Sequence, residues 1–137
     1  MSGVVVDASV ALAWCFPDEA SEYADGVLVA LKGQTLVVPA IWGLEITNAL
    51  LTGERRKRLK QPEILRFVAL LEGLSILQDG QGVSESVNKA LPLARHYGLS
   101  AYDAAYLELA IRHSTPLATL EGNLQKAARR AGIRIFP

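Results

Sequence analysis

Four carboxylates stand in sequence settings that an ordinary surface charge does not occupy. Asp7 and Glu121 each directly follow a short apolar run of strand character, which places both acids at the carboxyl ends of buried strands. Glu45 lies in a segment that is apolar on nearly every side of a helix, where a carboxylate needs a partner, a proton or a metal. Asp103 lies in the first turn of another expected helix.

Each of these acids also has a purely structural interpretation. Asp7 can cap the helix that follows it, and Glu45 can pair with Asn48, three residues further along the same helical stripe. Asp103 completes a Ser-x-x-Asp pattern, the spacing of a capping box. Glu121 is also explained as a first-turn acid that complements a helix dipole.

Taken together, the four acids predict a metal site. Like charges gathered in a partly buried crevice repel one another, and a divalent cation removes that cost. Hard oxygen ligands without histidine or cysteine favour Mg²⁺ or Mn²⁺ over Zn²⁺, and we expect His96 and His113 away from the acids. Such an ion binds phosphate oxygens and activates water for in-line attack. The residues therefore predict metal-dependent phosphodiester chemistry.

The elements that must position these acids alternate along the chain. Runs typical of strands buried on both faces lie at 4–6, 36–38, 74–77, 117–119 and, as a short fifth, 134–136. Stretches long enough for crossover helices separate them. The pattern predicts a single domain over residues 1–137, of α/β class, with a three-layer α/β/α sandwich around a parallel sheet of four to five strands. Ligands of such sheets bind beyond the carboxyl ends of the strands.

Capping signals and apolar spacing predict the helices. One helix starts at Pro17 and runs to about Lys32. Further helices are expected at 42–52 with Gly53 as its stop, 62–72, 84–97, 100–113 and 122–131. Pro92 conflicts with the helix over 84–97, so we expect a kink or a later start there. Glu108 and Arg112, four residues apart, are expected to form an ordinary exposed pair.

Composition excludes several broad classes of protein. The 137 residues hold 14 Lys and Arg against 14 Asp and Glu, which is not the balance of a general polyanion binder. A single cysteine, Cys15, excludes a disulfide scaffold. No apolar run approaches the ~20 residues of a spanning helix, and no signal-like segment precedes the first expected strand. We therefore expect a cytoplasmic protein without a membrane association.

Basic residues are nevertheless concentrated in two groups. The first is Arg55, Arg56, Lys57, Arg58 and Lys60. The second is Lys126, Arg129, Arg130 and Arg134. Groups of this kind either make local phosphate contacts or are solvated helix ends.

Four segments of the chain resemble those of PIN-domain proteins, and in length the chain is most similar to the VapC-type toxin ribonucleases. The segments lie at 4–12, 39–48, 99–106 and 117–121, and the resemblance covers essentially the whole chain. The third segment, Leu-Ser-Ala-Tyr-Asp-Ala-Ala-Tyr, is the most specific. The order and spacing of all four fit the family.

The resemblance implies a sheet of order 3-2-1-4-5 and an endoribonuclease that cuts RNA to leave a 5′-phosphate. It implies that a Mg²⁺ or Mn²⁺ site is built from the catalytic acids Asp7, Glu45, Asp103 and Glu121, with Ser9, Asn48 and Thr119 as polar helpers. The family's fourth acid is usually Asp, so Glu121, one methylene longer, is a departure that affects the second metal position. The resemblance also implies a small antitoxin that covers the site, and a homodimer.

Two other interpretations stay open at this level. A PIN-like module that binds RNA or protein without cutting is the first, and the unusual Glu121 would be its cause. A different α/β enzyme with an acidic pocket is the second. A phosphotransferase with Asp7 as nucleophile usually has another Asp at position 9, where this chain has Ser9. A receiver domain has paired acids beside its first strand and a lysine after its last, which this sequence lacks.

Overall fold

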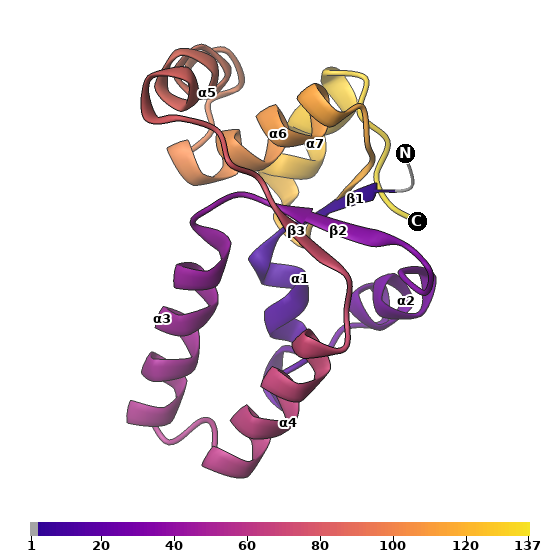
Figure 1. Cartoon of the computed structure of the whole chain (residues 1–137), viewed down its shortest axis with the longest axis vertical. Helices are drawn as coiled ribbons and strands as arrows, with labels where there is room; N and C mark the ends of the chain where they lie inside the picture. Colours follow the sequence, from indigo (N-terminus) through magenta and orange to yellow (C-terminus); the bar gives the residue numbers. More distant parts are fainter. Residues whose placement is uncertain (1–2) are drawn as a thin grey trace.

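The computed structural model describes residues 3–137 (Figure 1). Four parallel strands form one sheet in the order β3-β2-β1-β4. The strands are β1 Gly3–Val6, β2 Thr35–Val38, β3 Ile76–Gln78 and β4 Leu117–Ala118. The order expected for the first four strands is therefore confirmed. It makes β1 and β4 neighbours although more than a hundred residues separate them in the chain.

The expected fifth strand is reduced to a single bridge at the β4 edge. Leu117 pairs in parallel with Ile135, and the Leu117 N–H donates to the carbonyl of Arg134 at 3.0 Å. The Phe136 N–H donates back to the Leu117 carbonyl at 2.9 Å. Because β4 is only two residues long, it offers its neighbour too few backbone groups for a longer ladder.

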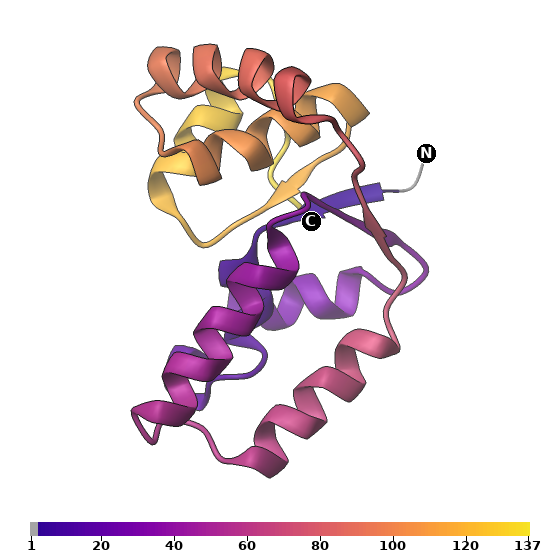
Figure 2. The ribbon, with the colours of Figure 1, turned by 60° about the vertical axis from the view of Figure 1, so that its left-hand side comes forward.

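Helices cover both faces of the sheet, as the three-layer prediction requires. In both ribbon views α5, α6 and α7 lie on one side and α1 to α4 on the other (Figures 1 and 2). The α-helices are α1 Ala8–Ala13, α2 Glu22–Ala30, α3 Trp42–Arg55, α4 Gln61–Glu72, α5 Val83–Tyr97, α6 Ala101–His113 and α7 Gly122–Arg130. Across residues 3–137, no helix combines the length and the apolar character of a bilayer span.

The apolar runs of β1, β2 and β4 build the core for which they were predicted, whereas the prediction of a buried third strand is wrong, because β3 lies at the edge of the sheet and its three residues are exposed. All four residues of β1 are buried, as are Leu36 to Val38 of β2, because both sheet faces are covered. Trp42, the first residue of α3, joins this core and its indole N–H donates to the Val6 carbonyl at 2.9 Å. That hydrogen bond fixes the start of α3 against the carboxyl end of β1.

The helix predicted from Pro17 to about Lys32 is wrong in its first turn. Pro17–Glu19 forms a separate 3₁₀ turn, η1, and α2 begins only at Glu22. Ser21 is the true N-cap, with an extended backbone and a hydroxyl that accepts from the Ala24 N–H at 3.2 Å. The proline signal marked the start of a helix, but the serine cap closer to the apolar stripe determines where the α-helix starts.

Gly53 does not end its helix, contrary to the prediction. Helix α3 continues to Arg55, and Gly53 is buried inside it. A Cβ atom at this position would lie 2.6 Å from Cε1 of the Phe16 ring. The glycine is therefore a place of close contact between α3 and the segment after α1. The chain turns two residues after the helix, where Lys57 has a φ of 60°.

Helix α5 is continuous from Val83 through Pro92, so a later helix start is wrong, and the expected kink stays a prediction. Pro92 is exposed and none of the residues of α5 is buried. Because the helix lies on the surface, water can satisfy the carbonyl that the proline leaves without an intrahelical donor.

Candidate active site

Asp7 lies at the carboxyl end of β1, and its side chain is held by groups from α1 and from the end of β4. The hydroxyls of Thr119 and Ser9 donate to its Oδ2 atom at 2.7 and 2.9 Å. The Ser9 N–H reaches Oδ1 at 3.5 Å, so Asp7 is also the N-cap of α1. Asp7 is only 4% exposed. Capping of α1 and a role in the site are therefore compatible, because one orientation of the Asp7 side chain allows both.

Glu45 enters the same region from α3 and finds its partner on α6. The Tyr106 hydroxyl donates to Glu45 Oε1 at 2.6 Å. The expected partner Asn48 lies one turn further along α3, and it faces the same cavity rather than forming the hydrogen bond. Tyr106 could not be assigned a role from the sequence, because a tyrosine on the buried stripe of a helix is indistinguishable from a core residue.

Asp103 and Glu121 complete the set from the starts of α6 and α7. Ser100 caps α6 by accepting from the Asp103 N–H at 3.1 Å, and the Asp103 carboxylate is turned to the cavity. Glu121 is exposed and occupies the N-cap position of α7 without a side-chain capping bond. Its N–H donates to the Thr119 hydroxyl at 3.0 Å. The same hydroxyl therefore connects Glu121 to Asp7.

These side chains line one cavity of about 410 Å³, which we call the acidic cavity. Its lining is Asp7, Ala8, Ser9, Leu12, Glu19, Glu45, Asn48, Asp103 and Glu121. All four predicted acids are present, with Ser9 and Asn48, while Thr119 lies behind Asp7. No basic side chain is part of this lining.

Glu19 is a fifth acid of the cavity and was not predicted. It belongs to η1, and Arg58 Nη2 lies 2.7 Å from its Oε2 atom. The same guanidinium binds Asp18 at 3.0 Å and stacks over the Phe16 ring, 4.4 Å from its centroid. One member of the first basic group is thus paired with the rim of the acidic cavity. No local pattern indicates this, because the two partners lie 39 residues apart.

The acids of the cavity repel one another. Burial raises the pKa of the Asp103 carboxyl, and the charges of Asp7 and Glu121 raise it further. Burial also raises the pKa of Glu45; the Tyr106 hydrogen bond opposes this, and the charges of Asp7 and Asp103 add to it. A bound cation would remove this repulsion between the carboxylates.

The donor set of the cavity fits a hard divalent cation. All of its charged groups are carboxylates, the ligands that Mg²⁺ and Mn²⁺ prefer. Within residues 3–137, however, no three or more His, Cys, Asp or Glu side chains already stand in the arrangement of metal ligands. The side chains therefore provide suitable chemistry rather than a finished coordination sphere.

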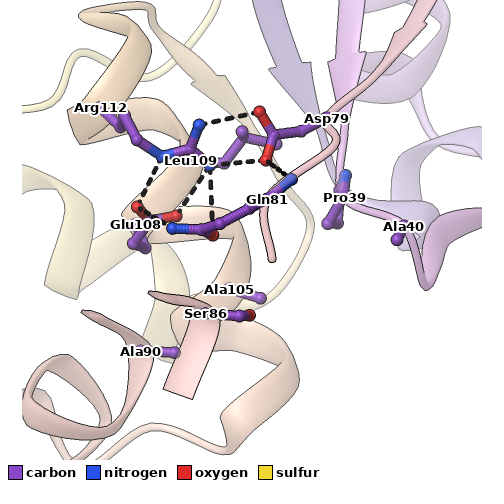
Figure 3. Close-up of a pocket in the computed structure, with 10 residues that line it drawn as sticks. All are labelled: Pro39, Ala40, Asp79, Gln81, Ser86, Ala90, Ala105, Glu108, Leu109 and Arg112. Carbon is purple, nitrogen blue, oxygen red and sulfur yellow. Dashed lines mark hydrogen bonds and ion pairs between the residues drawn. The ribbon is translucent and has the colours of Figure 1, made fainter. Parts of the chain in front are cut away.

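A second group of acids, from α6 and from the connection between β3 and α5, is paired with Arg112 (Figure 3). Arg112 donates to Asp79 Oδ1 and Oδ2 at 2.8 and 2.7 Å and to Glu108 Oε1 at 2.8 Å. His113 Nε2 lies 3.3 Å from Asp79 Oδ1, and Gln81 joins the group. We call these five residues the paired cluster; four of them, all but His113, surround a small cavity of about 60 Å³.

The paired cluster corrects the prediction of an exposed Glu108–Arg112 pair. Glu108 is 6% exposed, because the β3–α5 connection brings Asp79 over this face of α6. The Arg112 guanidinium, with His113, lowers the pKa of Asp79 to about 2, although partial burial opposes the shift. A helical spacing of four residues identified the two partners but not their burial.

A comparison with known protein families matches residues 4–130 to the PIN domain. The chain belongs to the PIN domain family. Ribonuclease VapC3 of Pyrobaculum aerophilum is 31% identical over 121 residues, covering 88% of this chain and 91% of that protein. The family expectation drawn from the four sequence segments is thereby confirmed.

Solved PIN-like structures share the fold at lower identity. PAE2754 of Pyrobaculum aerophilum superimposes with a TM-score of 0.67 at 23% identity, covering 91% of this chain and 78% of that one. FitAcB of Neisseria gonorrhoeae gives 0.64 at 19% identity, with 98% and 96% covered. A toxin–antitoxin complex of Klebsiella pneumoniae gives 0.57 at 16%, with 86% of each chain covered.

Proposed function

We propose that this PIN domain, spanning residues 1–137 as one unit, is a metal-dependent endoribonuclease and the toxin of a toxin–antitoxin pair. The observation that carries the proposal is the acidic cavity, in which acids from β1, α3, α6 and the start of α7 meet without a basic residue among the lining side chains. The ribonuclease named among its relatives supports the same activity. RNA is then the substrate and Mg²⁺ or Mn²⁺ the cofactor.

Each acid has a distinct part in this proposal. Asp7, Glu45 and Asp103 would hold the cation directly, and Glu121 would hold it through a water. When bound, the cation would neutralise the charge of a phosphate and activate a water. The hydroxyls of Ser9 and Thr119 fix one oxygen of Asp7 by two hydrogen bonds and so orient the other. Asn48 offers an uncharged amide on the same wall, suited to a phosphate or ribose oxygen.

Protein partners follow from the same proposal. A complex of toxin and antitoxin is among the structures that share the fold, and we propose an antitoxin and a homodimer for this chain too. Exposed apolar side chains on two helical faces support them: Leu44 and Leu65 on α3 and α4 are 72% and 61% exposed, and Val83 and Val87 on α5 are 84% and 55% exposed. Surfaces of this kind are typical of protein contacts. We propose that the chain acts on RNA in the cytoplasm.

Cleavage of a labelled single-stranded RNA tests the activity directly. We expect cutting in Mg²⁺ or Mn²⁺, none in excess chelator, and 5′-phosphate ends on the products. Asp7→Asn is the inactive control. Undiminished cutting in chelator with 2′,3′-cyclic ends contradicts the metal mechanism, because such ends require attack by the ribose 2′-hydroxyl. RNA binding in Mn²⁺ without any cutting favours the alternative of a binding module, for which the exposed Glu121 is the structural reason.

The first basic group is the proposed phosphate contact outside the cavity. Arg55, Arg56 and Lys57 are exposed at the tip between α3 and α4, whereas Arg58 is paired with Glu19. Reversing the three free charges to Glu should weaken RNA binding and lower the slope of log affinity against log salt by about 2. Filter binding at several salt concentrations measures both. An unchanged slope means that this tip is a solvated helix end.

A further inference from the structure

We propose that Tyr106 is a positioning residue, whose hydroxyl fixes the Glu45 carboxylate relative to Asp7 for cation binding. The inference rests on the proposed function, since it assigns a role within the same cavity. Tyr106 is not itself part of the cavity lining. It affects the cavity indirectly, through its hydrogen bond to Glu45.

The tyrosine hydroxyl joins three elements that carry acids. It belongs to α6, where Asp103 lies three residues earlier, and it donates to Glu45 of α3 at 2.6 Å. The same oxygen accepts from the N–H of Ala8 at 3.3 Å. Ala8 is the residue next to Asp7 and the first of α1. One side chain thereby sets the spacing between the acids of β1, α3 and α6.

The directions of these hydrogen bonds determine which Glu45 oxygen meets a cation. A phenol has one proton to give, and here it goes to Oε1 of Glu45 while the Ala8 N–H occupies the acceptor side. Within residues 3–137, Oε2 of Glu45 has no hydrogen-bond donor. That oxygen is left for the cavity, and the hydrogen bond to Oε1 restrains the rotation of the carboxylate.

Burial makes the arrangement rigid. Tyr106 is 0% exposed and Ala8 is 4% exposed, so water does not reach the hydroxyl from the side of the core. Outer hydrogen bonds of this kind orient metal ligands, and their loss typically weakens metal binding 10- to 100-fold. A purely structural tyrosine would instead affect stability alone.

Tyr106→Phe in the full chain separates the two roles, because it removes one oxygen and keeps the ring. Mn²⁺ binding is measured by the electron paramagnetic resonance of free Mn²⁺, and unfolding is measured by heat in the metal-free protein. We expect the Mn²⁺ dissociation constant to rise roughly 10-fold. Tyr23→Phe is the matched control, since the Tyr23 hydroxyl donates to the Phe136 carbonyl at 2.7 Å and is absent from the cavity lining. It should lower stability and leave Mn²⁺ affinity unchanged.

A double-mutant cycle tests the route through Glu45. Glu45→Gln should weaken Mn²⁺ binding, and adding Tyr106→Phe to it should weaken binding no further. Glu45→Asp, which withdraws the carboxylate from the hydroxyl and leaves the core intact, should reproduce the loss even where Tyr106→Phe proves too unstable to measure. Equal Mn²⁺ affinity of wild type and Tyr106→Phe, or additive effects in the cycle, overturns the inference. A wild-type protein that neither binds Mn²⁺ nor cuts RNA overturns the proposed function instead.

Discussion

Helix α6 contributes to two groups of acidic side chains, and only one of them is neutralised. In its first turn Asp103 faces the acidic cavity, where repulsion from Asp7 and Glu121 adds to the effect of burial in raising its pKa. Two turns later Glu108 and Arg112 belong to the paired cluster, where the pKa of Asp79 falls to about 2. The pKa of a carboxylate at the start of α6 is therefore raised, whereas the pKa of a carboxylate paired with Arg112 near the end of α6 is lowered.

The difference shows what distinguishes a structural acid from a functional one in this fold. The paired cluster supplies its own cation, with an arginine that meets two carboxylates and a histidine beside them. It therefore needs nothing from outside and stabilises the β3–α5 connection against α6. Repulsion between the carboxylates of the acidic cavity destabilises the folded protein, and a bound cation would stabilise it.

The largest expected contrast is in catalytic rate. Asp103→Asn should lower the single-turnover rate of RNA cleavage roughly 10³-fold, because it removes charge from the cation site. Asp79→Asn should stay within about 3-fold of wild type, because the paired cluster takes no part in the chemistry. Both rates are measured on one RNA at saturating Mn²⁺, with circular dichroism to confirm folding. Equal losses in both variants would abolish the distinction between the two groups.

The second contrast is in stability. Arg112→Met keeps the aliphatic contacts but leaves Asp79 and Glu108 without their cation, and we expect a loss of about 2 kcal/mol in unfolding free energy. The figure is below that of a fully buried pair because the Arg112 side chain is 26% exposed. Urea unfolding measures it. Lys89→Met, which breaks the exposed Lys89–Glu85 pair, is the control and should be indistinguishable from wild type.

Substitutions of Glu121 test whether this acid contacts the cation directly. It is the exposed acid of the four and the longer replacement for the usual Asp. We expect it to act through a water rather than by direct contact with the ion, so Glu121→Gln should slow cleavage only about 10-fold, less than Asp7→Asn. Glu121→Asp should match or exceed wild type. If single-turnover assays find Glu121→Gln as inactive as Asp7→Asn, then Glu121 is a direct ligand.

The smallest contrast is the dependence of metal-free stability on pH. Asp79 has a pKa of about 2 when folded against an ordinary 3.8, so its stabilisation is present above about pH 4 and is lost as pH falls toward 2. The raised pKa of Asp103 has the opposite effect on stability. The metal-free protein loses free energy of unfolding as the pH rises through that raised pKa and Asp103 ionises.

Thermal unfolding in chelator from pH 2 to pH 7 measures both effects. At pH 7 Asp103→Asn should raise the Tm, because the amide removes the repulsion from Asp7 and Glu121, and Asp79→Asn should lower it. Shifts of the same sign would contradict the assignment of one group as strained and the other as paired.

Sequence patterns located the parts of the site that depend on strand ends and helix starts. Asp7 and Glu121 were expected at the carboxyl ends of two strands, and in the structure both contact the Thr119 hydroxyl, Asp7 through its carboxylate at 2.7 Å and Glu121 through its N–H at 3.0 Å. Glu19 and Tyr106 could not be predicted, because their roles arise from contacts 39 and 61 residues away in the chain. The role of Asp79 was not predicted for the same reason. It lies in a loop, and only the fold brings it within hydrogen-bond distance of Arg112.

The close contact at Gly53 restricts which residues can replace this glycine. Alanine, the best helix former, is closed to this position of α3 unless the Phe16 ring moves, since a Cβ would lie 2.6 Å from it. Phe16 carries Arg58 on its face, and Arg58 holds Glu19 at the rim of the acidic cavity. A side chain larger than glycine at position 53 therefore requires the Phe16 ring to move, and that movement would reach the rim of the cavity through Arg58 without altering any residue that lines it.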